Sequence, residues 1–132
     1  MAMNMRSLRC RLPLLAFASL LLTGSVRPQN SRHTIRFTFS YDFRITPACS
    51  ATVKDKCVQQ FNFYDISKGV ASRVKLGSMP VPAGASGFVE EIGGTSKETL
   101  FKPGKHKVAV AAQMPDGTES DLERCTTIVE IH

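Results

Sequence analysis

The stretch that decides the fold is GKHKVAVAAQMPDGTES, residues 104–120. Two sets of side chains alternate along it, with His106, Val108, Val110, Ala112 and Met114 on one face and Lys105, Lys107, Ala109, Ala111 and Gln113 on the other. A period of two residues is typical of a half-buried β-strand. Pro115-Asp116-Gly117 then favours a turn, because proline fixes φ and the next two residues tolerate a chain reversal. The stretch therefore predicts a hairpin whose first strand belongs to the core.

A second alternating stretch, residues 33–43, predicts another long strand. Its inward positions are Ile35, Phe37, Phe39, Tyr41 and Phe43. An aromatic stripe of this kind can serve as a platform for stacking sugars, but large apolar side chains on one face of a strand are usually buried. We therefore expect these side chains to form the core.

Shorter β-rich segments follow, and no segment after the first 25 residues has helical periodicity. Two prolines and two glycines in residues 80–87 favour a sheet edge or a crossing loop, and Gly93-Gly94 is expected to interrupt the weak strand before it. Six or seven short strands with frequent turns predict an all-β fold, a two-layer antiparallel sandwich. The other expected strands are residues 58–66, 70–79, 88–92, 96–101 and 125–131.

The first 25 residues have the pattern of a secretory signal peptide. Arg6, Arg9 and Arg11 precede an apolar run, residues 12–22, and Thr23-Gly24-Ser25 offers small residues for cleavage. The run is too short for a membrane-spanning helix, which needs roughly 20 apolar residues. Cys10 precedes the run, which argues against a lipid anchor. We expect cleavage after Ser25, a flexible lead-in over residues 26–32, a single domain over residues 33–132, and a secreted, periplasmic or cell-surface location.

Net charge does not indicate nucleic-acid binding. Removing the three leader arginines lowers Lys plus Arg from 17 to 14 against 11 acids, so the formal charge falls from +6 to +3. The remaining basic residues are scattered singly, without the arginine and aromatic stripe of a nucleic-acid surface. We expect a solvated basic surface.

Export places the remaining cysteines, Cys49, Cys57 and Cys125, where disulfides form. Because three is an odd number, at least one thiol is expected to be free or bonded elsewhere. Cys49 and Cys57 bracket the loop of residues 44–57, and a bridge between them would stiffen it. The spacing of cysteines and histidines does not match a zinc site, so no metal or other cofactor is expected.

Catalytic motifs are also missing from the sequence, including G-x-S-x-G, H-E-x-x-H and phosphate-binding loops. His106 and a cysteine thiol would be expected at opposite ends of the fold. The acids Glu119, Asp121 and Glu123 lack the rhythm of a calcium loop. The sequence therefore predicts a protein that is not an enzyme.

Three segments together resemble a fibronectin type III domain or a close immunoglobulin-like relative over residues 33–131. VQQFNFYDI (58–66) is similar to the third strand of that family, LFKPGKHKVAVAAQ (100–113) to the turn into its sixth strand, and MPDGTES (114–120) to the next turn. His106 takes the inward position where the family often has a tyrosine. The resemblance implies that loops 44–57 and 115–124 lie at one end of the sandwich, with Cys125 near them. It favours pairing of Cys49 with Cys57 first, and of Cys49 with Cys125 second.

The leading interpretation is an exported, monomeric, non-catalytic module that binds a protein or glycan through loops 44–57 and 115–124. The competing interpretation is a structural or accessory subunit that docks on a larger cell-envelope assembly through an exposed edge strand, expected within residues 70–76. The candidate binding residues are Thr46, Lys54, Asp55, Asp116, Glu119 and Asp121.

Overall fold

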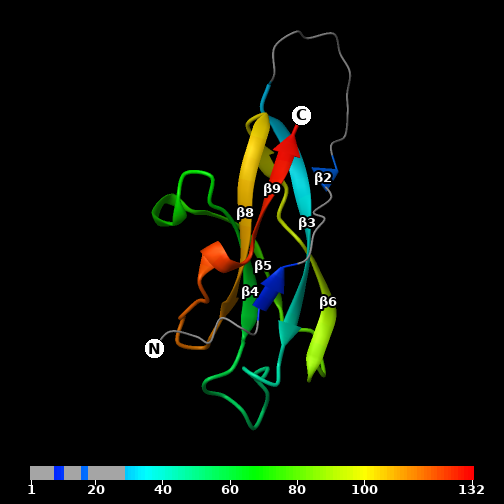
Figure 1. Ribbon diagram of the computed structural model, residues 1–132, viewed down its shortest axis with the longest axis vertical. Helices are drawn as coiled ribbons and strands as arrows, with labels where there is room; N and C mark the ends of the chain where they lie inside the picture. The colour runs from blue at the N-terminus through cyan, green and yellow to red at the C-terminus, as the bar shows by residue number, and fades with distance from the viewer. Residues whose placement is uncertain (1–7, 11–15, 18–28) are drawn as a thin grey trace.

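The computed structural model describes residues 8–10, 16–17 and 29–132 of the chain. From Ser31 onwards it forms an all-β sandwich of two packed antiparallel sheets (Figure 1). One sheet has the order β5-β4-β8-β9, and in the other β3 pairs with β6 and β7. These strands are β3 (Ser31–Asp42), β4 (Gln60–Asp65), β5 (Val74–Pro80), β6 (Phe88–Thr95), β7 (Thr99–Phe101), β8 (Gly104–Gln113) and β9 (Thr126–Ile131).

Strand β3 carries the aromatic stripe into the core, as predicted. Ile35, Phe37, Phe39 and Tyr41 are at most 1% exposed, so the alternative of a sugar platform on this face is wrong. Phe37 stacks on Phe63 of the opposite sheet, with ring centroids 4.3 Å apart. The strand begins two residues before the expected His33, because Ser31 and Arg32 pair with β7.

Strand β8 belongs to the core, as the sequence predicts, and lies between β4 and β9 in its sheet, but it is not half-buried. Residues 108–112 are all buried, including Ala109 and Ala111 on the expected outer face. Leu122, from a short 3-10 turn η3 (Leu122–Arg124), packs over these alanines together with Tyr64 and Ile66. A second 3-10 turn, η2 (Val70–Ser72), precedes β5. The sheet therefore has a small second core on its outer face.

The expected interruption at Gly93-Gly94 is wrong, because β6 runs through both glycines. A Cβ atom on Gly94 would lie 2.5 Å from Cζ of Phe63 and 2.7 Å from Sδ of Met79. Glycine here allows the two sheets to approach each other. The following strand is shorter than the expected residues 96–101, since β7 spans only Thr99–Phe101.

Part of the predicted leader lies within the described residues. Two short strands, β1 (Leu8–Cys10) and β2 (Ala16–Phe17), pair antiparallel with β3. The other residues of the predicted leader, the cleavage site after Ser25 and the first part of the lead-in lie outside the described residues. Among the residues that the structure describes, no helix is long and apolar enough to cross a membrane.

Candidate functional site

Loops 44–57 and 115–124 leave the sandwich at the same end, as expected (Figure 1). The first begins after β3, which ends at Asp42, and leads into β4. Gln60, where β4 begins, pairs with Gln113, where β8 ends and the second loop begins. Both loops are therefore anchored on one pair of neighbouring strands.

The first loop is closed by the predicted disulfide between Cys49 and Cys57, whose Cα atoms lie 4.9 Å apart. Two backbone hydrogen bonds hold the chain on either side of the bridge. Cys49 N–H donates to the Val58 carbonyl at 3.0 Å, and Val58 N–H donates to the Pro47 carbonyl at 2.9 Å. Cys125 is disulfide-bonded as well, and none of the cysteines with a described side chain is free. Because Cys49 bonds to Cys57, its alternative pairing with Cys125 does not occur.

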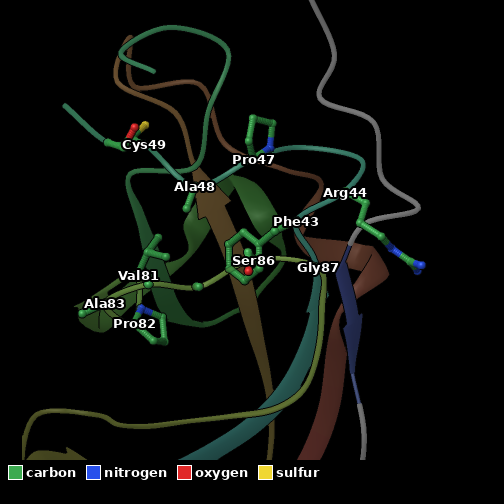
Figure 2. Close-up of a pocket in the computed structure, with 13 residues that line it drawn as sticks. Phe43, Arg44, Pro47, Ala48, Cys49, Val81, Pro82, Ala83, Ser86 and Gly87 are labelled. Atoms are coloured by element: carbon green, nitrogen blue, oxygen red, sulfur yellow. The ribbon is translucent and has the colours of Figure 1, made fainter. Parts of the chain in front are cut away.

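A pocket of about 410 Å³ opens beside this stapled loop (Figure 2). One wall comes from the segment 43–50, through Phe43, Arg44 and residues 47–50, and the other from residues 81–87. Phe43 joins the two walls, since its N–H donates to the Gly87 carbonyl at 2.8 Å and its side chain is only 5% exposed. Gly84 and Gly87 have positive φ angles of 72° and 66°, which shape the second wall into a turn.

The lining of this pocket is mainly apolar. It includes Phe43, two prolines and three alanines, with hydroxyls only from Ser50 and Ser86. In Figure 2 the Arg44 side chain points away from the other lining residues. No His, Asp or Glu lines the pocket, so its side chains include no general acid or base of the usual kinds. The lining therefore offers mainly apolar contact surface.

The candidate residues of the first loop do not line this pocket. Thr46 is 8% exposed and buried in the fold, whereas Lys54 and Asp55 are exposed on the stapled loop. Asp55 accepts a hydrogen bond from the N–H of Lys56 at 2.9 Å, and Lys56 has a positive φ of 50°. Lys54 and Asp55 therefore form the charged outer part of the loop, next to a turn in the backbone.

The three candidate binding residues of the second loop, Asp116, Glu119 and Asp121, accept hydrogen bonds within the domain. Asp116 accepts from the N–H of Thr118 at 2.9 Å, which lowers its pKa. Asp121 is the N-cap of η3 and accepts from the N–H of Glu123 at 3.0 Å. Glu119 accepts from two side chains of β4. This loop is held in shape by its own carboxylates.

The bonds to Glu119 form part of a polar cluster on the outer face of β4. The Tyr64 hydroxyl donates to Glu119 Oε2 at 2.8 Å, and Asn62 Nδ2 lies 3.1 Å from the same oxygen. Asn62 also donates to Gln113 Oε1 at 2.7 Å. Burial, followed by the hydrogen bond to Glu119, raises the pKa of Tyr64 to about 12. Because Asn62 and Tyr64 are 0% and 6% exposed, the cluster stabilises the loop.

His106 lies at the opposite end of the sandwich, where β8 begins. Its Nε2 donates to the Lys102 carbonyl at 2.7 Å, and its Nδ1 is 2.9 Å from Asp65 Oδ2. Burial opposes ionisation of Asp65, but hydrogen bonds from Ser67 and then from His106 lower its pKa overall. One backbone carbonyl and one carboxylate therefore hold His106, at the end of the sandwich away from loop 44–57.

The second pocket wall, residues 81–87, is the feature that the sequence did not assign to a site. Its prolines and glycines indicated a loop, but no local signal placed that loop opposite residues 43–50.

The described residues contain no group of three or more His, Cys, Asp or Glu side chains that could hold a metal ion. No protein-family model, curated protein or solved structure matches the chain.

Proposed function

We propose that this chain is an exported, non-catalytic, fibronectin type III-like module that binds an apolar side chain of a protein ligand in the pocket between residues 43–50 and 81–87. The observation that carries the proposal is the pocket itself, with one wall fixed by the Cys49–Cys57 bridge. A wall that is already ordered loses little conformational entropy when a ligand binds.

Export is supported by the basic and apolar pattern of the first 25 residues and by the disulfide, which forms in oxidising compartments. The fibronectin type III-like assignment is supported by the four-stranded order β5-β4-β8-β9, packed on a sheet of β3, β6 and β7. His106 bonds back to the corner at Lys102, which is the role that a tyrosine often has in this family.

A protein ligand is favoured over a glycan by the chemistry of the pocket. Sugar hydroxyls require polar side chains such as carboxylates and amides, and the lining contains neither. Phe43, Pro47 and Pro82 instead offer apolar surface, with backbone groups between them. Such a lining suits a Leu, Met or aromatic side chain of an extended segment.

The test uses the full chain, recovered after export from secreting cells. Ala83 is exposed and lines the pocket, so Ala83→Trp should fill it and abolish binding. Ala71→Trp in η2 is the matched control, since Ala71 is also exposed and lies outside the pocket lining. Extracellular proteins captured by the wild type and by Ala71→Trp, but lost with Ala83→Trp, support the proposal. If Ala83→Trp retains the same proteins, or if a glycan competes for the pocket, the assignment is wrong.

A second candidate function, docking as a structural subunit, is favoured by the position of β5. This strand is at the edge of the four-stranded sheet, and its Val74 is 55% exposed. An exposed edge strand can pair with another chain. Concentration-dependent assembly in size-exclusion chromatography, abolished by a proline introduced within residues 70–76, would support this function over pocket binding.

A further inference from the structure

A second pocket, of about 200 Å³, opens at the end of the sandwich where His106 lies. Its lining comes from residues within the segment 65–76, which joins β4 to β5 and includes the start of β5, and from the segment 99–102 together with His106. None of these residues lines the pocket beside the stapled loop. The two pockets are therefore separate sites.

Part of this lining is exposed apolar surface. Val74 and Leu100 are each 55% exposed, and they are two of the five large apolar side chains that are exposed among the residues the structure describes. Leu76 and Phe101 line the same pocket and are at most 3% exposed. An apolar group that covers such surface removes it from water, which favours binding. The pocket therefore offers an apolar contact for one part of a ligand.

The charged side chains of the pocket favour an anion as the other part. Two lysines, Lys68 and Lys102, line it against a single acid, Asp65. The Asp65 carboxylate already accepts hydrogen bonds from Ser67 and lies 2.9 Å from Nδ1 of His106. Its charge is therefore used within the protein, whereas both lysines are exposed.

Three side-chain donors of the pocket are available to a ligand. Among the described residues, no hydrogen bond or ion pair occupies the ammonium groups of Lys68 and Lys102 or the hydroxyl of Ser72. The Thr99 hydroxyl, by contrast, donates to the Lys97 carbonyl at 2.9 Å. A carboxylate accepts several hydrogen bonds, and those from ammonium groups are among the strongest. The unused donors therefore match a carboxylate.

The size of the pocket narrows the ligand further. Pockets for whole small molecules usually measure roughly 300 to 1,000 Å³, and this one is smaller. It has room for one side chain and the group next to it. The last residue of a polypeptide carries a side chain and a carboxylate on the same Cα atom, so it can use both parts of the lining at once. Capture of a terminal carboxylate is a recurring mode of peptide recognition.

We propose that this second pocket binds the carboxyl-terminal residue of a partner protein. The apolar side chain of that residue contacts Val74 and Leu100, and its carboxylate accepts hydrogen bonds from Lys68, Ser72 and Lys102. The site goes beyond the proposed function, because it shares no residue with the pocket beside the stapled loop. It does not depend on export.

The test uses the full chain and two peptide probes. One is N-acetylated Gly-Gly-Leu with a free carboxylate, and the other is the same peptide with a carboxyl-terminal amide. NMR titration follows the methyl signals of Val74 and Leu100. The free carboxylate should shift both sets of signals and bind about ten-fold more tightly than the amide. Equal binding of the two probes, or no shift of these methyl signals, would show that the proposal is wrong.

Variants then identify the groups that hold the carboxylate. Lys68→Gln and Lys102→Gln should each weaken binding of the free carboxylate about five-fold and leave binding of the amide unchanged. Lys75→Gln is the matched control, since Lys75 is exposed on β5 and lies outside the lining. Leu100→Asp should abolish binding, because it places a carboxylate beside that of the ligand. If Lys75→Gln weakens binding as much as the other two lysine variants, surface charge in general binds the probe, and the proposal fails.

Two further measurements identify the source of the carboxylate and separate the two pockets. Octanoate has an apolar chain longer than one side chain and no peptide group, so it should bind more weakly than the tripeptide. If it binds equally or more tightly, the occupant is a free fatty acid, and a protein terminus is excluded. Ala83→Trp, which fills the first pocket, should leave binding of the tripeptide unchanged. If it weakens that binding, the tripeptide occupies the first pocket and the second site is wrong.

Discussion

Loops 44–57 and 115–124 lie at the same end of the sandwich, but they are held in different ways. The first is closed by a covalent bond between Cys49 and Cys57 and leaves the charges of Lys54 and Asp55 exposed. The second has no such bridge within it and uses Asp116, Glu119 and Asp121 as hydrogen-bond acceptors. Acidic residues in a surface loop can therefore be part of its structure, whereas a stapled loop leaves its charged side chains accessible to a ligand.

Removing the covalent bond should have the largest effect. Replacing Cys49 and Cys57 together by alanine frees the unfolded chain from a short closed loop, which should lower the free energy of unfolding by roughly 2 to 3 kcal/mol. Chemical denaturation of the full chain measures this change, with Lys54→Ala as the control inside the same loop. A loss smaller than about 0.5 kcal/mol would show that the backbone bonds around Val58 hold the loop by themselves.

Removing the acceptor of the second loop should cost somewhat less. Glu119→Ala leaves the buried Tyr64 hydroxyl and the Asn62 amide without their shared acceptor, which should cost roughly 1.5 to 2 kcal/mol of unfolding free energy. Glu119→Gln retains a carbonyl oxygen and should lose less than half of that. Equal losses in the two variants would contradict a role based on hydrogen bonding.

The same cluster predicts a dependence of stability on alkaline pH. The pKa of Tyr64 is about 12 in the folded protein, against 10.0 ordinarily, so the unfolded chain loses this proton first. The contribution of Tyr64 to stability is therefore complete below about pH 10 and is lost as the pH rises towards about 12. Between about pH 10 and pH 12, the denaturation midpoint of the wild type should therefore fall more steeply with pH than that of Tyr64→Phe. If the two midpoints fall in parallel as the pH rises, the raised pKa of Tyr64 does not contribute to stability.

The smallest effect is expected at the exposed tip of the second loop. Asp116→Asn keeps an oxygen that accepts from the Thr118 N–H, so the denaturation midpoint should barely change. In the wild type, the Thr118 N–H lowers the pKa of Asp116 below its ordinary 3.8, and NMR titration of the Asp116 carboxylate can detect this shift. Titration at or above 3.8 would show that the hydrogen bond is not maintained in solution.

Local chemistry was enough to predict much of the fold. The alternation in residues 104–113 and 33–43 identified β8 and β3, because each strand has a face that must leave water. The bridge between Cys49 and Cys57 was also predicted, although it was preferred over Cys49–Cys125 through a family resemblance. Pro115-Asp116-Gly117 marked the turn after β8 through the conformations those residues allow.

The candidate site was less predictable, because its parts are far apart in the sequence. Glu119 was expected at a binding surface, since nothing near it in the chain shows that Asn62 and Tyr64 donate to it across the sheet. The pocket depends on residues 81–87 meeting residues 43–50. The sequence also read Gly94 as a break in a strand, whereas the Phe63 ring makes it a point of close packing.

The sequence by itself determined the strand period, the main turns and the inward aromatic stripe, because these depend on neighbours one or two positions away. Tertiary structure alone decided which carboxylates accept hydrogen bonds within the domain and where a pocket opens. It also decided that residues 8–10 and 16–17 lie on the edge of β3. Such features depend on which strands become neighbours. That choice is made by burial of the whole core rather than by any single stretch of the chain.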